Sequence, residues 1–423
     1  MARGSRGRPS RARKRCDRGK TQPDRRRLAI RTLSGLFGGR RPRPALAAFI
    51  PRPQAELKSA LSPLVSQAQE PRKLDFFQNP RQHMAMTAAD SSLGVLSDRA
   101  LLRAIESGWI RTGQNLSPGQ LQPASLDLRL GSVAYRVRAS FLPGAAQVED
   151  WLDDRLVMHR IDLSAGAVLE KGCVYVAPLQ ESLALPADLH GAANPKSSTG
   201  RLDVFTRMIV DGADAFDQAP QGYHGPLFAE ISPCTFSIVV KEGARLSQLR
   251  LRRGQPQPVR EELFRIGVPH EGVAGYRAKR HAGVIDLDRI GAYDPADFWE
   301  PLYARNGRLV LDPGEFYIFA SHEDVAIPAG EAAEMAPIRP ELGEFRAHYA
   351  GFFDPGFGIA PRQGKAVLEV RSRDVPFIVE NRQPVGRLVF ETLSEPAAAL
   401  YGDIGSSYQG QGLKLAKHFK PWG

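Results

Sequence analysis

Cysteine is scarce in this chain of 423 residues, and long apolar runs are missing from it. The three cysteines, Cys16, Cys173 and Cys234, lie far apart and form no C-x-x-C pair, which excludes a disulfide framework and a cysteine-based zinc site. No stretch approaches the roughly 20 consecutive apolar residues of a membrane helix, and no secretory signal pattern opens the chain. We therefore expect a cytoplasmic protein with no membrane partner.

The histidines exclude one class of enzyme. Zinc-dependent nucleobase deaminases need an H-x-E element and a P-C-x-x-C element to hold the metal and a proton-transferring glutamate. None of the nine histidines has glutamate two positions later, and Cys234, which follows a proline, has no second cysteine at the required spacing. We expect no zinc cofactor.

The positive charge of the chain is concentrated at its start. Residues 1–83 contain 21 Lys and Arg against 5 Asp and Glu, which leaves 36 against 41 for residues 84–423. Because residues 1–83 have few periodic apolar positions, we predict a disordered extension. It could bind nucleic acid through its basic side chains, serve as an organelle-targeting presequence, or reflect a true translation start at Met84 or Met86. We expect nucleic-acid binding, if any, through this extension alone.

One helix and many short strands are predicted after residue 92. A helix over residues 97–107 would begin at Ser97, as N-cap, and bury Leu101, Leu102 and Ile105. Short runs rich in branched and aromatic residues follow, separated by Gly, Pro and Asp, at residues 126–130, 173–177, 236–240, 309–311 and 377–379. This pattern predicts a mainly β fold with a few short helices.

An internal repeat divides the same part of the chain. Residues 169–176 (LEKGCVYV) are echoed 142 positions later by residues 311–318 (LDPGEFYI). Further matches keep the same order: residues 185–187 with 327–329, Pro195 with Pro337, and residues 227–231 with 367–370. We predict two tandem copies of one β domain, the first at residues 93–260 and the second at residues 261–423.

A short polar segment distinguishes the first copy from the second. Residues 194–201 (NPKSSTGR) place serine hydroxyls beside two cations, groups that suit phosphate oxygens or an ordered water. A capped turn or a helix start is the alternative. The second copy has lost the serines, because Ser197 falls on Arg339 and Arg201 falls on Gly343.

Each copy also carries one carboxylate within an otherwise apolar strand, Glu230 in the first copy and Glu369 in the second. Burying a carboxylate is costly unless it is paired, so each is a candidate general base or acid. A buried Glu–Arg ion pair is the alternative for either residue. Just before these strands, Asp217 and Asp354 lie in turn sequences. Residues 401–412 (YGDIGSSYQGQG) form a glycine-rich tail that could close over a bound polyphosphate or remain untied.

Five strings in this order resemble the dCTP deaminase family, whose members share their fold with the trimeric dUTPases. The strings are residues 94–99 (GVLSDR), 121–131 (LQPASLDLRLG), 196–201 (KSSTGR), 367–369 (VLE) and 408–411 (YQGQ). The resemblance implies a double-length form with two tandem dUTPase-like domains, each a β-clip or distorted jelly-roll. It also implies hydrolysis of dCTP to dUTP and ammonia, which supplies dUTP for thymidylate synthesis. Mg²⁺ would be carried by the triphosphate, with no catalytic metal.

The resemblance implies a role for each candidate residue. Glu230 or Glu369 would act as general base on the attacking water, while Ser197 and Arg201 would hold that water and the nucleobase. The remaining residues would bind the nucleotide: Lys196 and Ser198 at the phosphates, Asp217 or Asp354 near the sugar, and Tyr401, Tyr408 and Gln411 from the tail.

The doubled domain departs from the family pattern and leaves alternatives open. Family members are usually single-domain chains whose trimers form sites between subunits. Here the site could lie wholly in the first copy, with Glu230, or be composite, with Glu369. We expect a homo-oligomer of three two-domain chains. Lys196 also replaces a family arginine and so loses a bidentate phosphate contact. The alternative functions are a bifunctional dCTP deaminase and dUTP diphosphatase that releases dUMP, and a non-catalytic nucleotide-binding protein.

Overall fold

The computed structural model describes residues 93–255, 257–338, 345–348, 351–361, 363–372 and 374–422, and for residues 345–348 it describes the backbone alone. All of these residues belong to one compact unit. The predicted extension at residues 1–83, the alternative starts at Met84 and Met86, and the second-copy positions Arg339 and Gly343 lie outside the described residues.

The predicted helix forms as α1 (Asp98–Glu106). Its N-cap is Ser97, whose Oγ accepts a hydrogen bond from the backbone N–H of Ala100 at 3.4 Å, as expected for a serine at this position. One part of the prediction is wrong, because Leu102 is 42% exposed. The buried face instead follows a spacing of three residues, which leaves Leu102 about 100° around the helix from Leu101. Its members are Asp98, Leu101 and Ala104.

Two sheets form most of the first copy. In its described residues one sheet contains, in spatial order, β11 (Gln218–Ala219), β9 (Leu189–Pro195), β14 (Arg245–Arg253), β4 (Ser125–Arg129) and β3 (Leu121–Gln122), with β1 (Gly94–Val95) beside β14. The other contains β10 (Val204–Val210), β12 (His224–Pro233), β8 (Val174–Ala184), β5 (Val133–Val137) and β6 (Val157–Asp162), with β2 (Ile110–Arg111) beside β8. A smaller sheet joins β7 (Ala167–Leu169) and β13 (Ile238–Val240) to β17 (Ile285–Asp286), a strand from the second copy.

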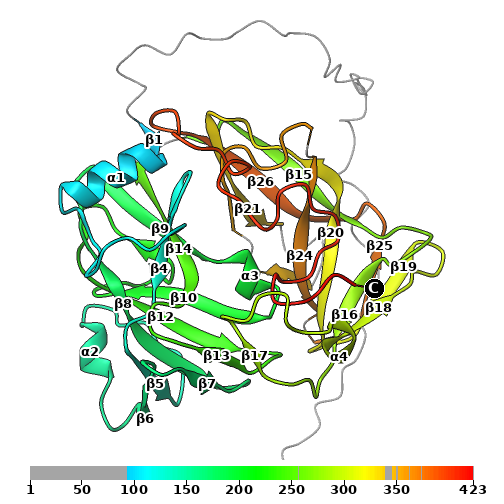
Figure 1. Cartoon of the computed structure of the whole chain (residues 1–423), viewed down its shortest axis with the longest axis horizontal. Helices are drawn as coiled ribbons and strands as arrows, with labels where there is room; N and C mark the ends of the chain where they lie inside the picture. The colour runs from blue at the N-terminus through cyan, green and yellow to red at the C-terminus, as the bar shows by residue number, and fades with distance from the viewer. Residues whose placement is uncertain are drawn as a thin grey trace, which may run out of the picture. The chain divides into compact units, whose positions relative to one another are not determined.

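One large sheet forms most of the second copy (Figure 1, yellow-green to orange). Its described strands are, in spatial order, β18 (Trp299–Leu302), β16 (Gly275–Ala278), β20 (Phe316–Val325), β15 (Arg260–Gly267), β26 (Pro384–Thr392), β21 (Glu331–Pro337) and β23 (Phe352–Phe353). Beside this path, β24 (Gly364–Ser372) pairs with β20 and with β22 (Phe345–His348). A separate pair joins β19 (Arg308–Leu311) to β25 (Phe377–Glu380). The helices other than α1 in the described ranges are single turns: α2 (Val148–Trp151), α3 (Ser197–Gly200) and α4 (Pro295–Phe298).

The pairing of strands repeats between the copies, as the sequence repeat predicts. The antiparallel pair β8–β12 of the first copy corresponds to β20–β24 of the second, and β10–β12 corresponds to β22–β24. The pairs β9–β14 and β7–β13 likewise correspond to β21–β26 and β19–β25. Glu230 of β12 and Glu369 of β24 therefore occupy equivalent positions. The structure is mainly β, and the predicted fold class is confirmed.

A hydrophobic cluster spans the two copies and holds them together. Phe236 of the first copy packs against Trp299 of the second, with ring centroids 5.5 Å apart, and both are almost fully buried. Burying an aromatic side chain of this kind contributes roughly 1.5–3 kcal/mol. The same cluster includes Val367 of β24. The first copy thus packs on the face of β24 that carries Val367.

Candidate active site

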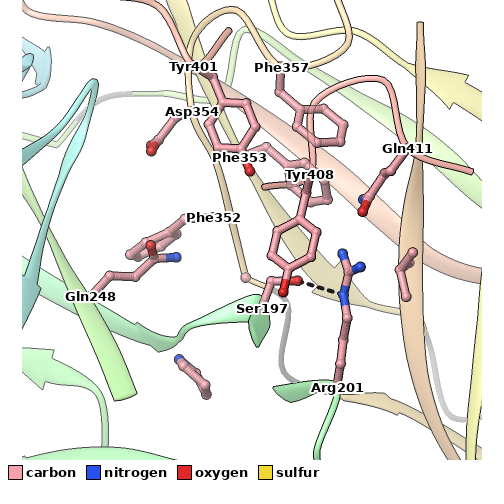
Figure 2. A pocket seen from close by; sticks show the side chains of 13 residues that line it. Ser197, Arg201, Gln248, Phe352, Phe353, Asp354, Phe357, Tyr401, Tyr408 and Gln411 are labelled. Carbon is pink, nitrogen blue, oxygen red and sulfur yellow. Dashed lines mark hydrogen bonds between the residues drawn. The ribbon is translucent and has the colours of Figure 1, made fainter. Parts of the chain in front are cut away.

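A cavity lies where the two copies meet, and most of the candidate residues line it (Figure 2). The first copy contributes Pro195, Ser197, Arg201 and Gln248, and the second contributes Gly351, Phe352, Phe353, Asp354, Phe357, Val367, Tyr401, Tyr408 and Gln411. This cavity is narrow, about 50 Å³. It adjoins a wider and more polar cavity of about 480 Å³ that shares Ser197, Asp354 and Tyr408 with it and is also lined by Lys196 and Ser198.

The serine–arginine segment forms α3, and Arg201 follows it directly. The Nε of Arg201 donates to the Oγ of Ser197 at 3.2 Å, and its Nη1 donates to the backbone carbonyl of Lys414 at 2.8 Å. Its guanidinium also lies 3.9 Å from the centre of the Tyr408 ring, a cation–π contact. Figure 2 shows the Tyr408 ring pointing toward Ser197 and Arg201. These contacts hold a buried positive charge in one orientation at the cavity.

Glu369 lies on the face of β24 that is turned toward the first copy. Successive side chains of a strand alternate between its two faces, so Val367 and Glu369 share a face. Val367 lines the narrow cavity and packs in the cluster that spans both copies, whereas Leu368 and Val370 pack in the core of the second copy alone. Glu369 is fully buried. Burial raises the pKa of Tyr408, and the nearby charge of Glu369 raises it further.

Glu369, Glu230 and Asp217 are all absent from the linings of these two cavities, but Glu369 shares its strand face with Val367, which lines the narrow one. On β12 the face of Glu230 also carries Phe228, which packs in a separate cluster of the first copy. The Oε1 of Glu230 accepts a hydrogen bond from the Nη2 of Arg207 at 2.7 Å. Of the two alternatives given for Glu230 in the sequence analysis, the structure shows the buried Glu–Arg ion pair. Asp217 accepts from the backbone N–H of Met208 at 2.7 Å. Equivalent strand positions thus have different surroundings in the two copies.

Asp354 is held at the cavity by an arginine of the first copy. Arg250 on β14 is fully buried, and its Nη2 donates to an Oδ1 of Asp354 and to the backbone carbonyl of Phe353, at 3.2 and 3.3 Å. The guanidinium of Arg250 lies 4.0 Å from the centre of the Phe352 ring. Burial nevertheless raises the pKa of Asp354. An arginine of the first copy therefore fixes the turn that follows β23 of the second.

The tail is fastened to the second copy. The backbone N–H of Lys365 in β24 donates to the carbonyl of Gln411 at 2.7 Å, and the Nε2 of Gln411 donates to the Lys365 carbonyl at 3.0 Å. Tyr401 packs edge-on against Phe357, with ring centroids 5.4 Å apart. The sequence suggested a tail that closes or remains untied, and here Tyr401, Tyr408 and Gln411 all line the narrow cavity. The tail residues therefore form one wall of the candidate site.

The lining of the wide cavity has four lysines and arginines against four carboxylates, and three of the cations gather around one of those carboxylates, Asp127. Lys196 forms an ion pair with Asp127 of β4, and Arg245 lies 3.5 Å from the same carboxylate. Lys417 lines the cavity as well, and its pKa is lowered by burial and by the neighbouring charges of Lys196 and Arg245. Three cations share one carboxylate at this place. Such an arrangement favours a bound anion.

Sequence reasoning missed several lining residues. Gln248 and Arg245 belong to β14, a strand whose residues match none of the recognisable strings, and Phe352 belongs to a two-residue strand. A signal existed for Phe352 and its neighbour, because they directly precede Asp354. No comparable signal existed for Arg245, since its position depends on the pairing of β14 with β4.

The buried Asp217 predicts a measurable pH dependence of stability. Burial raises its pKa to about 7 from an ordinary value of 3.8, so the folded protein binds a proton that the unfolded chain releases. The protonated Asp217 side chain therefore contributes to the free energy of unfolding at low pH, and this contribution is lost as the pH rises toward 7. Asp217→Asn keeps the acceptor for Met208 and tolerates the left-handed φ of 62°. We expect the stability of the variant relative to wild type to rise by roughly 2 kcal/mol from pH 5 to pH 8 in urea titrations.

A matched control for this experiment is Asp162→Asn. Asp162 is exposed, and hydrogen bonds from Ser164 lower its pKa rather than raise it. Its variant should show no such gain between pH 5 and pH 8. Parallel stability curves for Asp217→Asn and wild type would contradict the predicted protonation.

The described part of the chain contains neither a cluster of metal ligands nor a membrane-spanning helix. No group of three or more His, Cys, Asp or Glu side chains gathers there in a way that could hold a metal ion. Among the same residues no helix has the length and apolar character needed to cross a bilayer.

Comparisons with known proteins relate both copies to one family. Residues 92–255 match the N-terminal domain, and residues 251–419 the C-terminal domain, of the family model for 2'-deoxycytidine 5'-triphosphate deaminase. A "dCTP deaminase, dUMP-forming" from Beutenbergia cavernae is 32% identical over 146 residues, which are 32% of this chain and 73% of that protein. A "dCTP deaminase" from Haloarcula marismortui is 28% identical over 192 residues, 45% of this chain and 95% of that protein.

A solved structure resembles this chain over most of the described residues. The crystal structure of 2'-deoxycytidine 5'-triphosphate deaminase from Agrobacterium tumefaciens is 51% identical, with a TM-score of 0.69. The match covers 71% of this chain and 99% of that one.

Proposed function

The chain belongs to the dCTP deaminase family, hydrolases that act on C–N bonds, and on that premise we propose that it converts dCTP and water to dUTP and ammonia. The proposed active site is the composite cavity between its two copies. One observation carries this proposal: Ser197 and Arg201 of the first copy line a cavity together with the face of β24 that bears Glu369. The first-copy glutamate, Glu230, is engaged elsewhere by Arg207.

Glu369 is proposed as the general base. It removes a proton from a water molecule whose oxygen attacks C4 of cytosine, and the C4–N bond then breaks. The first proton passes through Glu369 to N3 of the ring. The proton of the new C4 hydroxyl then passes through Glu369 to the amino group, which leaves as ammonia, while C4 keeps the oxygen as the carbonyl of uracil. Ser197 and Arg201 orient the water and stabilise the charge that develops during attack. Their mutual hydrogen bond supports this role, because it fixes both groups before substrate binds.

The shapes of the two cavities support an orientation for the nucleotide. We place the nucleobase at the narrow cavity because aromatic side chains wall it, with Asp354 near the sugar; at about 50 Å³ the cavity must widen when the base enters. The wide cavity suits the triphosphate, which would meet Lys196, Ser198 and the newly recognised Arg245 and Lys417. Mg²⁺ enters with the triphosphate as part of the substrate.

A second product is supported by the relatives. Several of them are named "dCTP deaminase, dUMP-forming", including those from Beutenbergia cavernae and from Methanothermobacter thermautotrophicus, of which the matched part covers 66%. If this chain shares that chemistry, water also cleaves the bond between the α- and β-phosphates, and pyrophosphate leaves. The deaminase that stops at dUTP is our first proposal.

The products of dCTP test both proposals. The full chain is incubated with dCTP and Mg²⁺, with and without a zinc-specific chelator, and the nucleotides and ammonia are quantified. We expect one ammonia released for each dUTP formed, unaffected by the chelator. Release of dUMP with pyrophosphate would replace the first proposal by the second. Intact dCTP after prolonged incubation would overturn both.

A further inference from the structure

A buried ion pair connects the serine–arginine segment to the strand of Glu369. Asp203 lies two residues after Arg201, in the turn from α3 to β10, and is fully buried. Its carboxylate accepts from the Nε of Arg371 at 3.2 and 3.1 Å and from the Nη2 of the same guanidinium. Asp203 belongs to the first copy and Arg371 to the second. The two copies are therefore joined by a charged pair beside the proposed catalytic residues.

The first-copy end of this pair is rigidly attached to α3. The backbone N–H of Asp203 donates to the carbonyl of Gly200 at 2.8 Å, and its own carbonyl accepts from the N–H of Cys234 at 2.9 Å. The Oγ1 of Thr235 donates to the carboxylate at 2.6 Å. Asp203 has a left-handed φ of 56°, which aspartate and asparagine tolerate better than most residues. A shift of its carboxylate would therefore move α3.

The second-copy end is attached to β24. Arg371 follows Glu369 by two residues, so the two side chains share one face of the strand. The Nη1 of Arg371 donates to the carbonyl of Gly314 at 2.7 Å, and its Nη2 donates to the Oγ1 of Thr235 at 2.8 Å. Glu369 consequently lies between Val367, which lines the cavity, and Arg371, which binds Asp203.

We propose that the Asp203–Arg371 ion pair is a positioning pair that sets Ser197 and Arg201 at the correct distance from Glu369. The inference rests on the proposed role of Glu369 and adds residues that touch neither substrate nor reacting atoms. Asp203 is two residues from Arg201 along the chain, and Arg371 is two residues from Glu369. The ion pair therefore links the segment of Arg201 to the strand of Glu369, and both of these residues must act on one water molecule. A misplacement of about 1 Å at such a site can cost on the order of 100-fold in rate.

The test compares Asp203→Asn and Arg371→Lys with a matched control. The control is Glu391→Gln, which weakens the two 2.7 Å hydrogen bonds from Arg252, another nearly buried ion pair between the copies. Glu391 lines neither of the two cavities. We expect Asp203→Asn to lower kcat for dCTP by roughly 10- to 100-fold, with the dissociation constant for dCTP changed less than about threefold. Arg371→Lys, which keeps the charge, should fall between this variant and wild type.

Two outcomes would overturn the positioning role. One is a kcat for Asp203→Asn within about twofold of wild type. The other is an equal loss of kcat in Glu391→Gln, which would mean that any weakening of the contact between the copies has the same effect. If Asp203→Asn does not fold, kcat of Arg371→Lys is compared with wild type and with Glu391→Gln in the same way.

Hydrogen exchange separates this inference from the proposed function. The amides of residues 199–203 donate to carbonyls within the α3 turn, so their exchange reports how firmly the segment is held. Asp203→Asn should speed their exchange at least severalfold, and Glu391→Gln should not. Should wild type fail to deaminate dCTP, the proposed function falls, and the exchange data still decide whether the pair holds α3. Unchanged exchange in Asp203→Asn would reject the positioning pair even if wild type is active.

Discussion

Glu369→Gln should lower kcat for dCTP deamination by roughly two to four orders of magnitude, the usual contribution of general-base catalysis. The amide has the size of the carboxylate but cannot take the proton of the attacking water. Because the change keeps the shape of the cavity, the dissociation constant for dCTP should remain within a few-fold of wild type. Steady-state kinetics together with calorimetric titration of dCTP check both parts of this expectation.

The matched control is Glu230→Gln at the equivalent strand position of the first copy. Its side chain binds Arg207 and shares a strand face with Phe228, which packs within the first copy and not at the cavity, so kcat should stay within a few-fold of wild type. Stability should fall instead, because the variant leaves the Arg207 charge without its buried partner. If Glu230→Gln loses activity and Glu369→Gln keeps it, the site lies in the first copy and the composite arrangement is wrong.

Arg201→Lys should lower kcat by roughly 100- to 1,000-fold, similar to the loss of one donor that stabilises developing charge. The guanidinium of Arg201 contacts Ser197, the carbonyl of Lys414 and the ring of Tyr408 at the same time. A lysine ammonium keeps the charge but lacks the planar fork that makes these contacts together. Kinetics with dCTP, and with deoxycytidine as a substrate without phosphates, measure the loss; both should fall alike, since Arg201 acts at the base.

Arg207→Lys is the corresponding control. Arg207 also stacks on an aromatic ring, 3.5 Å from the centre of Phe216, and also bonds a partner side chain, Glu230. It differs from Arg201 chiefly in lying away from the cavity. A drop in kcat for Arg207→Lys as large as that for Arg201→Lys would show that the loss reflects general damage to the fold.

Local patterns in the sequence predicted the elements well because short-range contacts determine them. Ser97 capped α1 as expected, and the runs at residues 126–130 and 377–379 became β4 and β25. Leu102 was misplaced because helical spacing admits two apolar faces, and only packing against the sheet selects one. The repeat could be read directly, since equivalent strands carry equivalent residues.

The choice between Glu230 and Glu369 could not be made from the sequence. Both lie in an apolar strand, and alternation along a strand is the same whichever face is turned toward the other copy. What differs is the long-range packing, which places Val367 in a shared cluster and Phe228 in a local one. The same limit applies to Arg245 and Lys417, which reach the wide cavity through contacts between residues far apart in the chain.

The origin of the two walls of the cavity has a thermodynamic consequence. The α3 segment and β24 lie in one polypeptide, so their encounter is an intramolecular event with a fixed effective concentration. Mass action does not separate them: dilution that would dissociate a site shared by two subunits leaves this pair of walls in contact. For these two walls, contact at low protein concentration depends only on the folding equilibrium of a single molecule. The peptide chain that joins the two copies therefore keeps these two walls together, whereas a site between separate subunits depends on their affinity for each other.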